Sequence, residues 1–247
     1  MPIGPARMSI MDHIAELRRR LTIIVVALLA VATLLYFVTP TIIDIILDPV
    51  REYLPRDGQI AIFSTLGGFS IRFKVALFVG AIVIAPLIIW EVMAFFLPAL
   101  KPSERKWVVP TVIAMVVLFF VGMIFCYFII IPAAFEWLVS QSTEIATVVP
   151  NAEDFISITL LIEIGFGVAF EMPIVIFYLI IFKLVKLQTF RKHWRGIYVG
   201  LLVFSAIVTP DASPVTMFLM FAALIVLYEG SLALATLLAR KEQADTT

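Results

Sequence analysis

The stretch FLPALKPSERK, residues 96–106, decides how the chain folds, because it separates two long apolar runs. No charged side chain occurs upstream in residues 75–90, and none occurs downstream in residues 107–132. Apolar runs of this kind can cross the hydrocarbon core of a bilayer as helices, which takes about 20 residues. We therefore place the loop at a membrane surface, where it holds one carboxylate, Glu104, within a basic cluster.

Composition agrees with a membrane location. Of the 247 residues, 62% are hydrophobic, and the mean hydropathy is +1.10. Soluble domains are only about half apolar, so the composition predicts an integral membrane protein. The formal net charge is zero, which gives no reason to expect a nucleic-acid partner. The single cysteine, Cys126, lies inside an apolar run and cannot form an intrachain disulfide, so we expect it to be a packing residue.

The apolar runs predict an all-α protein with six membrane-spanning helices. We expect these spans at residues 21–38, 69–95, 107–132, 155–182, 196–209 and 215–228. The two final spans are short, since about 14 helical residues rise roughly 21 Å, whereas the hydrocarbon core is about 30 Å thick. We also expect Pro86 to kink the second span, because proline lacks the backbone N–H of the helical ladder.

The charged residues predict the orientation and the domain boundaries. Most of the Lys and Arg residues fall in segments 1–20 and 96–106, in segment 183–195 and in the tail, whereas loop 133–154 has none. By the positive-inside rule, both termini are then cytoplasmic, in a cell-membrane protein that crosses the bilayer several times. We divide the chain into a cytoplasmic amphipathic segment (residues 1–20), a single transmembrane domain (21–239) and a cytoplasmic tail (240–247).

The sequence lacks the common motifs of catalysis. It contains no Gly-rich phosphate loop followed by Lys, no His-Glu-x-x-His and no Gly-x-Ser-x-Gly. Its two histidines, His13 and His193, fall near cytoplasmic span ends. We therefore expect no enzymatic activity, no cofactor and no metal.

Two carboxylates, Glu163 and Glu171, fall inside the predicted fourth span, where an ionised acid is costly and usually faces a protein interior or a wet cavity. Glu171 could hydrogen-bond to backbone freed by Pro173, or it could line a path for a polar chain. Both acids could instead carry protons or ions in a secondary transporter of a small solute. We expect Glu91 and Glu229, near cytoplasmic span ends, to be interfacial.

Glu16 and Glu104 both fall on the predicted cytoplasmic side, and arginines follow each of them closely. These acids could simply pair with those arginines three or four residues along the same segment. Alternatively, two carboxylates on one surface could accept guanidinium groups bidentately, which lysine could not match.

Four motifs in register resemble those of the TatC family, the six-span subunit of the twin-arginine protein translocase. They are HIAELRRR at residues 13–20, FFLPAL at 95–100 followed by Glu104 and Arg105, FEMP at 170–173, and TPD at 209–211. The resemblance covers nearly the whole chain. It departs from the family at Glu91, where the family often has Gln, and at Glu163, for which the family gives no expectation.

The resemblance implies a concave helical bundle that receives paired-arginine signal peptides and helps export folded proteins, using the proton motive force. By position, Glu16 and Glu104 would bind the two signal arginines. The residues that would shape this surface are Arg18, Phe95, Leu100 and Arg105. Glu171 would face the concave side, Asp211 would lie near a partner-helix contact, and Pro49 would support a periplasmic cap. The implied partners are signal peptides, membrane lipid, small single-span subunits of the TatA and TatB types, and further copies of the chain in a larger complex.

Overall fold

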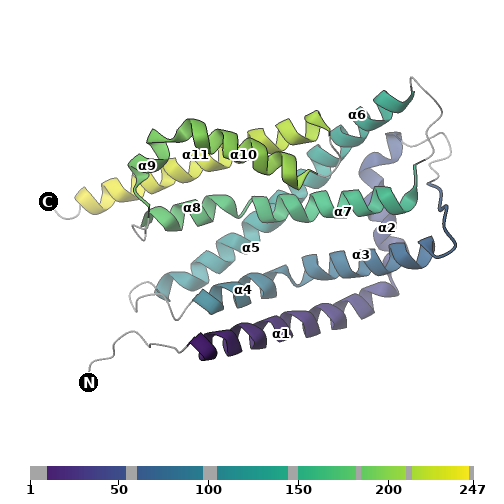
Figure 1. Ribbon diagram of the computed structural model, residues 1–247, viewed down its shortest axis with the longest axis horizontal. Helices are drawn as coiled ribbons and strands as arrows, with labels where there is room; N and C mark the ends of the chain where they lie inside the picture. Colours follow the sequence, from purple (N-terminus) through teal and green to yellow (C-terminus); the bar gives the residue numbers. More distant parts are fainter. Residues whose placement is uncertain are drawn as a thin grey trace. The chain divides into compact units, whose positions relative to one another are not determined.

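The computed structural model describes residues 10–53, 60–96, 105–143, 150–181, 185–209 and 213–244. Within these ranges the regular secondary structure is helical, and the one extended feature is an isolated bridge between Ala61 and Asn151 (Figure 1). The all-α prediction is therefore confirmed. The chain divides into two compact units, one of Met1–Ile46 with Ile62–Val117, the other of Leu47–Ala61 with Leu118–Thr247.

The first unit is organised around α1 (Ile10–Tyr36), a single 27-residue helix. The amphipathic segment predicted to precede the first span is thus continuous with it. Helix α1 packs along α3 (Gly67–Val83) and α4 (Ala85–Phe96), as Figure 1 shows. Small side chains at this contact, Ala32 and Ala76, are buried, which lets apolar helices approach closely where lipid supplies no hydrophobic driving force between them. Helix α2 (Thr39–Leu47) follows α1 after a two-residue turn.

The predicted kink in the second span is present. Helices α3 and α4 meet at Ile84 with a bend of 56°. Pro86 is the second residue of α4, a position at which a missing backbone N–H costs little because the first turn has no intrahelical acceptor. The Ile84 N–H still donates to the Gly80 carbonyl, so the break leaves few backbone groups unsatisfied.

The third span extends further than expected. Helix α5 (Val108–Phe125) continues through one π-helical turn, η4 (Cys126–Ile130), into α6 (Ile131–Thr143). The prediction that residues 133–143 form part of a loop was wrong. The wider turn lets the Ile131 N–H donate to the Cys126 carbonyl and places Pro132 at the start of α6, where proline is tolerated. Cys126 is fully buried, as a packing residue should be.

The second unit also contains the 3₁₀ helix η1 (Asp48–Tyr53), α7 (Ala152–Ala169), α8 (Met172–Ile181) and α9 (Leu187–Lys192). Asn151 caps α7 by accepting a hydrogen bond from the Glu153 N–H. Helices α7 and α8 are separated by a turn at Phe170 and Glu171. A long helix, α11 (Pro214–Ala244), packs against α8 and α10 (Trp194–Val208), as Figure 1 shows.

Only one of the two final spans is short. Helix α10 (Trp194–Val208) has 15 residues, as expected, but α11 (Pro214–Ala244) has 31. The prediction of a short last span was therefore wrong. Glu229 and Gly230 interrupt the apolar run, yet they leave the helical hydrogen-bond ladder intact, and apolar residues resume beyond them with Leu232 and Ala235 buried.

Several helices can cross a membrane. Four in the described part of the chain are long and apolar enough, and the bent pair α3 and α4 would be a fifth span. Large apolar side chains are exposed on these helices and on α10, such as Phe128 at 69% and Ile207 at 75%. Such surfaces are normal for a protein whose solvent is lipid and are unusual in a soluble monomer.

Helices α5 and α7 approach so closely that two glycines are required. A Cβ atom on Gly122 would lie 2.8 Å from the Phe166 carbonyl oxygen and 2.7 Å from the Phe170 ring. On Gly167 it would lie 2.7 Å from the Phe119 ring. We predict that Gly122→Ala lowers the free energy of unfolding by about 1–3 kcal/mol, the usual cost of overpacking, measured as a lower Tm in detergent.

The matched control is Gly200→Ala in α10, where no atom lies within 4 Å of the added Cβ. Alanine has the higher helix propensity, so this variant should melt no earlier than the unaltered protein. Equal Tm values for the two variants would contradict the close approach of α5 to α7.

We also predict that the bilayer is thinned around α10, because 15 helical residues rise about 22 Å. We place spin labels at the exposed positions Val199, Val203 and Ile207. Labels within a turn or two of either end of α10 should be accessible to a polar relaxation agent. Labels at Val109, Val117 and Ile124 on α5 provide the full-length comparison. An equally deep lipid-buried profile along α10 would rule out the thinning.

Candidate functional site

One guanidinium joins two carboxylates between α1 and α4. Arg20 Nη2 lies 2.6 Å and Nε 3.1 Å from Oε1 of Glu16, one helical turn earlier on α1. Arg20 Nη1 donates to Oε2 of Glu91 on α4 at 2.8 Å. The three side chains are between 10% and 22% exposed. We call Glu16, Arg20 and Glu91 the α1–α4 ion cluster.

One shielded acceptor of the cluster is unused within the described part of the chain. Oε2 of Glu16 is screened from solvent and has no hydrogen-bond partner there. No further ion pair to Glu16 or Glu91 is present among the described residues. Two carboxylates and one guanidinium carry a formal charge of −1, and an uncompensated charge in a poorly solvated place is costly. The arrangement is therefore suited to one more cation.

An aromatic pair continues the same contact towards the helix ends. His13 stacks on Phe95 with ring centroids 4.3 Å apart and planes 26° apart. His13 precedes Glu16 by three residues, and Phe95 follows Glu91 by four, so each shares a helix face with its neighbour in the cluster. The structure thus brings the predicted site residues Glu16 and Phe95 to one interface.

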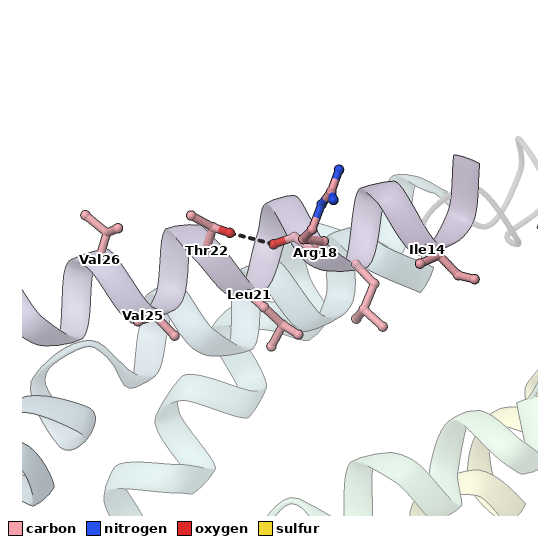
Figure 2. A pocket seen from close by; sticks show the side chains of 7 residues that line it. Ile14, Arg18, Leu21, Thr22, Val25 and Val26 are labelled. Atoms are coloured by element: carbon pink, nitrogen blue, oxygen red, sulfur yellow. Dashed lines mark hydrogen bonds between the residues drawn. The ribbon is translucent and has the colours of Figure 1, made fainter. Parts of the chain in front are cut away.

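Arg18 lies apart from that interface. It is exposed and lines a shallow groove on the outer surface of α1, with Ile14, Leu21, Thr22, Val25 and Val26. In Figure 2 the Arg18 side chain extends away from the helix, on another side from Leu21 and Val25, while its carbonyl accepts a 2.8 Å hydrogen bond from Thr22 Oγ1. No ion pair to its guanidinium is present among the described residues.

Other predicted site residues are distributed differently. Arg105 is exposed in the short 3₁₀ helix η3 (Arg105–Trp107). Leu100, Glu104 and Asp211 lie outside the described residues, so their predicted roles stay predictions. Pro49 is half-buried in η1, which packs against α6 and places Val50 in the core of the second unit.

Glu171 lies at a break between two helices of the second unit. It occupies the turn between α7 and α8, where its backbone N–H donates to the Val168 carbonyl at 3.1 Å. Both of its carboxylate oxygens are shielded and have no hydrogen-bond partner in the ranges that the structure describes. The alternative in which this side chain bonds to backbone freed by Pro173 is therefore wrong. Glu163 is half-buried on α7, which packs against η4.

The sequence did not predict that Glu91 belongs to the ion cluster. We expected an interfacial residue, but Glu91 is only 8% exposed and is bonded to Arg20, 71 residues earlier. Its position on α4 offered one signal, because Glu91 and Phe95 share a helix face four residues apart. The pairing partner could not be inferred, since it depends on the packing of α4 against α1 after the bend at Ile84.

We predict that Arg20→Met destabilises the protein by about 3 kcal/mol, because it leaves two poorly solvated carboxylates without a counter-charge. Arg19→Met is the matched control, since Arg19 is the adjacent arginine, is exposed and has no ion pair among the described residues. Thermal unfolding in detergent should show a Tm loss for Arg20→Met alone. Equal Tm values for both variants would mean that the cluster contributes nothing to stability.

Apolar spanning helices with a partly buried ion cluster define a membrane protein of several spans. Residues 12–222 match the model of the family described as Sec-independent protein translocase protein (TatC). The TatC protein of Aquifex aeolicus is 32% identical over 96% of this chain and 98% of its own length, and that of Synechocystis is 30% identical over 94% and 90%. A crystal structure of the twin-arginine translocase receptor TatC superposes with a TM-score of 0.78 at 30% identity, covering 91% of this chain and 98% of that one.

The chain belongs to the TatC family of protein translocase subunits. The resemblance inferred from the four motifs is confirmed. The alternative of a small-solute transporter finds no support in these relatives, which are translocase proteins.

Proposed function

We propose that this protein is the signal-peptide receptor and core subunit of a twin-arginine translocase, which helps export folded proteins across the cell membrane. The observation that carries the proposal is that Oε2 of Glu16 has no partner among the described residues, in a cluster that is short of one positive charge within the same residues. A carboxylate oxygen fixed in this way suits a guanidinium, whose N–H groups donate strong, charge-assisted hydrogen bonds. The related crystal structure, described as a receptor, adds support.

Recognition would use two acids for two arginines. Glu16 accepts one signal arginine and Glu104 the other, while Arg18, Phe95, Leu100 and Arg105 shape the surrounding surface. Lysine presents a point charge without the fixed fork, so the paired arginines would not be interchangeable with lysines. The stack of His13 on Phe95 holds the Phe95 ring at the edge of this surface.

The proposed topology has six spans, with both termini cytoplasmic. The four long apolar helices, the bent pair of α3 and α4 counted as one span, and the shorter helix α10 support a count of six. The same orientation places the ion cluster at the cytoplasmic ends of α1 and α4, where an arriving signal peptide would meet it.

Transport itself would require partners. Six helices enclose too little room for a folded protein, so the chain would act in a larger complex with further copies of itself and with TatA-type and TatB-type subunits. The proton motive force would supply the energy, with no cofactor. Glu171, Glu163 and Asp211 would contact the signal peptide or a partner helix, and Pro49 would support the periplasmic cap.

A crosslinking experiment tests the receptor role. A twin-arginine signal peptide with a photoreactive group next to its arginines is added to membranes that contain the full-length protein. We predict that Glu16→Gln with Glu104→Gln lowers the crosslinking yield at least tenfold, since each lost charge-assisted hydrogen bond costs about 1.5–3 kcal/mol.

The matched control is Glu136→Gln, which removes an exposed acid on α6 and should leave the yield unchanged. Co-purification of single-span partners with the variant shows that the complex is intact. A double variant that crosslinks as well as the unaltered protein would refute the assignment of these two residues.

A further inference from the structure

The way in which Arg20 holds Glu16 is asymmetric. In the strongest arginine–carboxylate pairs, two N–H groups donate to two different oxygens. Here both Nε and Nη2 donate to the same oxygen, Oε1 of Glu16, at 3.1 and 2.6 Å. No described residue donates a hydrogen bond to Oε2. The internal arginine therefore bonds one oxygen of the Glu16 carboxylate and leaves the other, which is shielded from solvent, without a hydrogen bond.

Glu91 explains this asymmetry. Its Oε2 accepts from Nη1, the nitrogen of Arg20 that faces away from Glu16, at 2.8 Å. The Arg20 guanidinium is planar and is held by Glu91 at Nη1 and by Glu16 at Nε and Nη2, so it cannot rotate freely. The Glu91 contact therefore fixes which oxygen of Glu16 the Nε and Nη2 groups meet. Glu91 is the most deeply buried member of the cluster, with a side chain only 10% exposed, and is thus the firmer of the two groups that hold Arg20.

We propose that Glu91 is a positioning residue for signal-peptide recognition, which holds Arg20 on one oxygen of Glu16 so that the other oxygen can receive a single incoming guanidinium. The inference rests on the proposed receptor function. Bound ligand would make the cluster neutral, with two guanidiniums shared by two carboxylates. Without Glu91, Arg20 turns to donate to both oxygens of Glu16, and this closes the site to the ligand.

The same geometry assigns a source of specificity. A ligand arginine can donate to Oε2 of Glu16 through one N–H while its remaining N–H groups reach other acceptors. A lysine ammonium lacks the planar fork and gains less from an oxygen whose direction is fixed. Glu91 would therefore determine the preference for arginine over lysine as well as the affinity.

Two substitutions at position 91 separate positioning from simple charge. Glu91→Gln keeps the shape and removes the charge. Glu91→Asp keeps the charge and withdraws the carboxylate by one methylene from Nη1. We expect both variants to bind a twin-arginine peptide about tenfold more weakly, the effect of losing one charge-assisted hydrogen bond, and to lose most of the preference over a peptide with lysine in place of one arginine.

The measurement is the fluorescence anisotropy of both labelled peptides with the full-length protein in lipid nanodiscs. Arg20→Lys supplies the coupling test, because it keeps the positive charge but cannot bridge both acids. If Glu91 acts through Arg20, Glu91→Gln has no further effect on affinity in the Arg20→Lys background. Glu136→Gln is the exposed control and should bind both peptides as the unaltered protein does.

The outcomes distinguish the proposed receptor function from the proposed positioning role of Glu91. An unaltered protein that binds neither peptide refutes the receptor function. If Glu16→Gln abolishes binding while both position-91 variants keep the affinity and the arginine preference, the positioning role alone is refuted. It is also refuted if only Glu91→Gln weakens binding and the preference is unchanged, because Glu91 then acts by charge alone. Should Glu91→Gln fail to fold, as judged by its Tm, Glu91→Asp decides the question.

Discussion

Backbone hydrogen bonding in an apolar solvent determines where the helices of this chain can be interrupted. Within lipid, an unsatisfied N–H or carbonyl costs several kcal/mol, so a spanning helix can break only where its freed groups find partners. The described breaks obey this constraint. At Ile84 the N–H keeps its bond to Gly80, and at η4 the ladder shifts to i→i+5 without being lost. Prolines 86 and 132 follow these two breaks closely, so each proline falls where a missing donor costs least.

The same constraint makes the polar side chains of the helices informative. A guanidinium or carboxylate on a spanning helix must be paired, hydrated or held for a ligand. Arg20 meets this demand through Glu16 and Glu91, and the cluster still retains a negative charge. Glu171 does not meet it within the described residues, because both of its oxygens lack a partner. Among the described residues of each unit, therefore, one acid has shielded oxygens without a hydrogen-bond partner. Glu16 and Glu171 are the strongest candidates for contact with something outside the chain.

The sequence predicted the features that depend on local chemistry. Apolar runs located the spanning helices, Pro86 predicted the bend, and four motifs identified the family. The prediction of helix ends from the sequence failed where the backbone hydrogen bonds continued through residues that usually end a helix. Glu229 and Gly230 did not stop α11, and Pro132 did not stop the third span, because a single polar pair or a proline at a π turn leaves the ladder largely intact. Prediction from the sequence also failed for Glu91, whose partner Arg20 is distant along the chain and is met only through the packing of α4 on α1.

That long-range contact changes how the Glu16 site must be understood. A carboxylate on an exposed helix would rotate freely and would select cations by charge alone. Here α1 and α4 are both regular helices, and the contact between them fixes Glu16 through Arg20 and Arg20 through Glu91. Sites supported by helices and by a second layer of hydrogen bonds hold their geometry more closely than sites built on loops. If Glu16 binds a signal arginine as proposed, its selectivity for a guanidinium follows from the packing of two membrane helices. Any change that separates α4 from α1 would then weaken recognition without touching the acid itself.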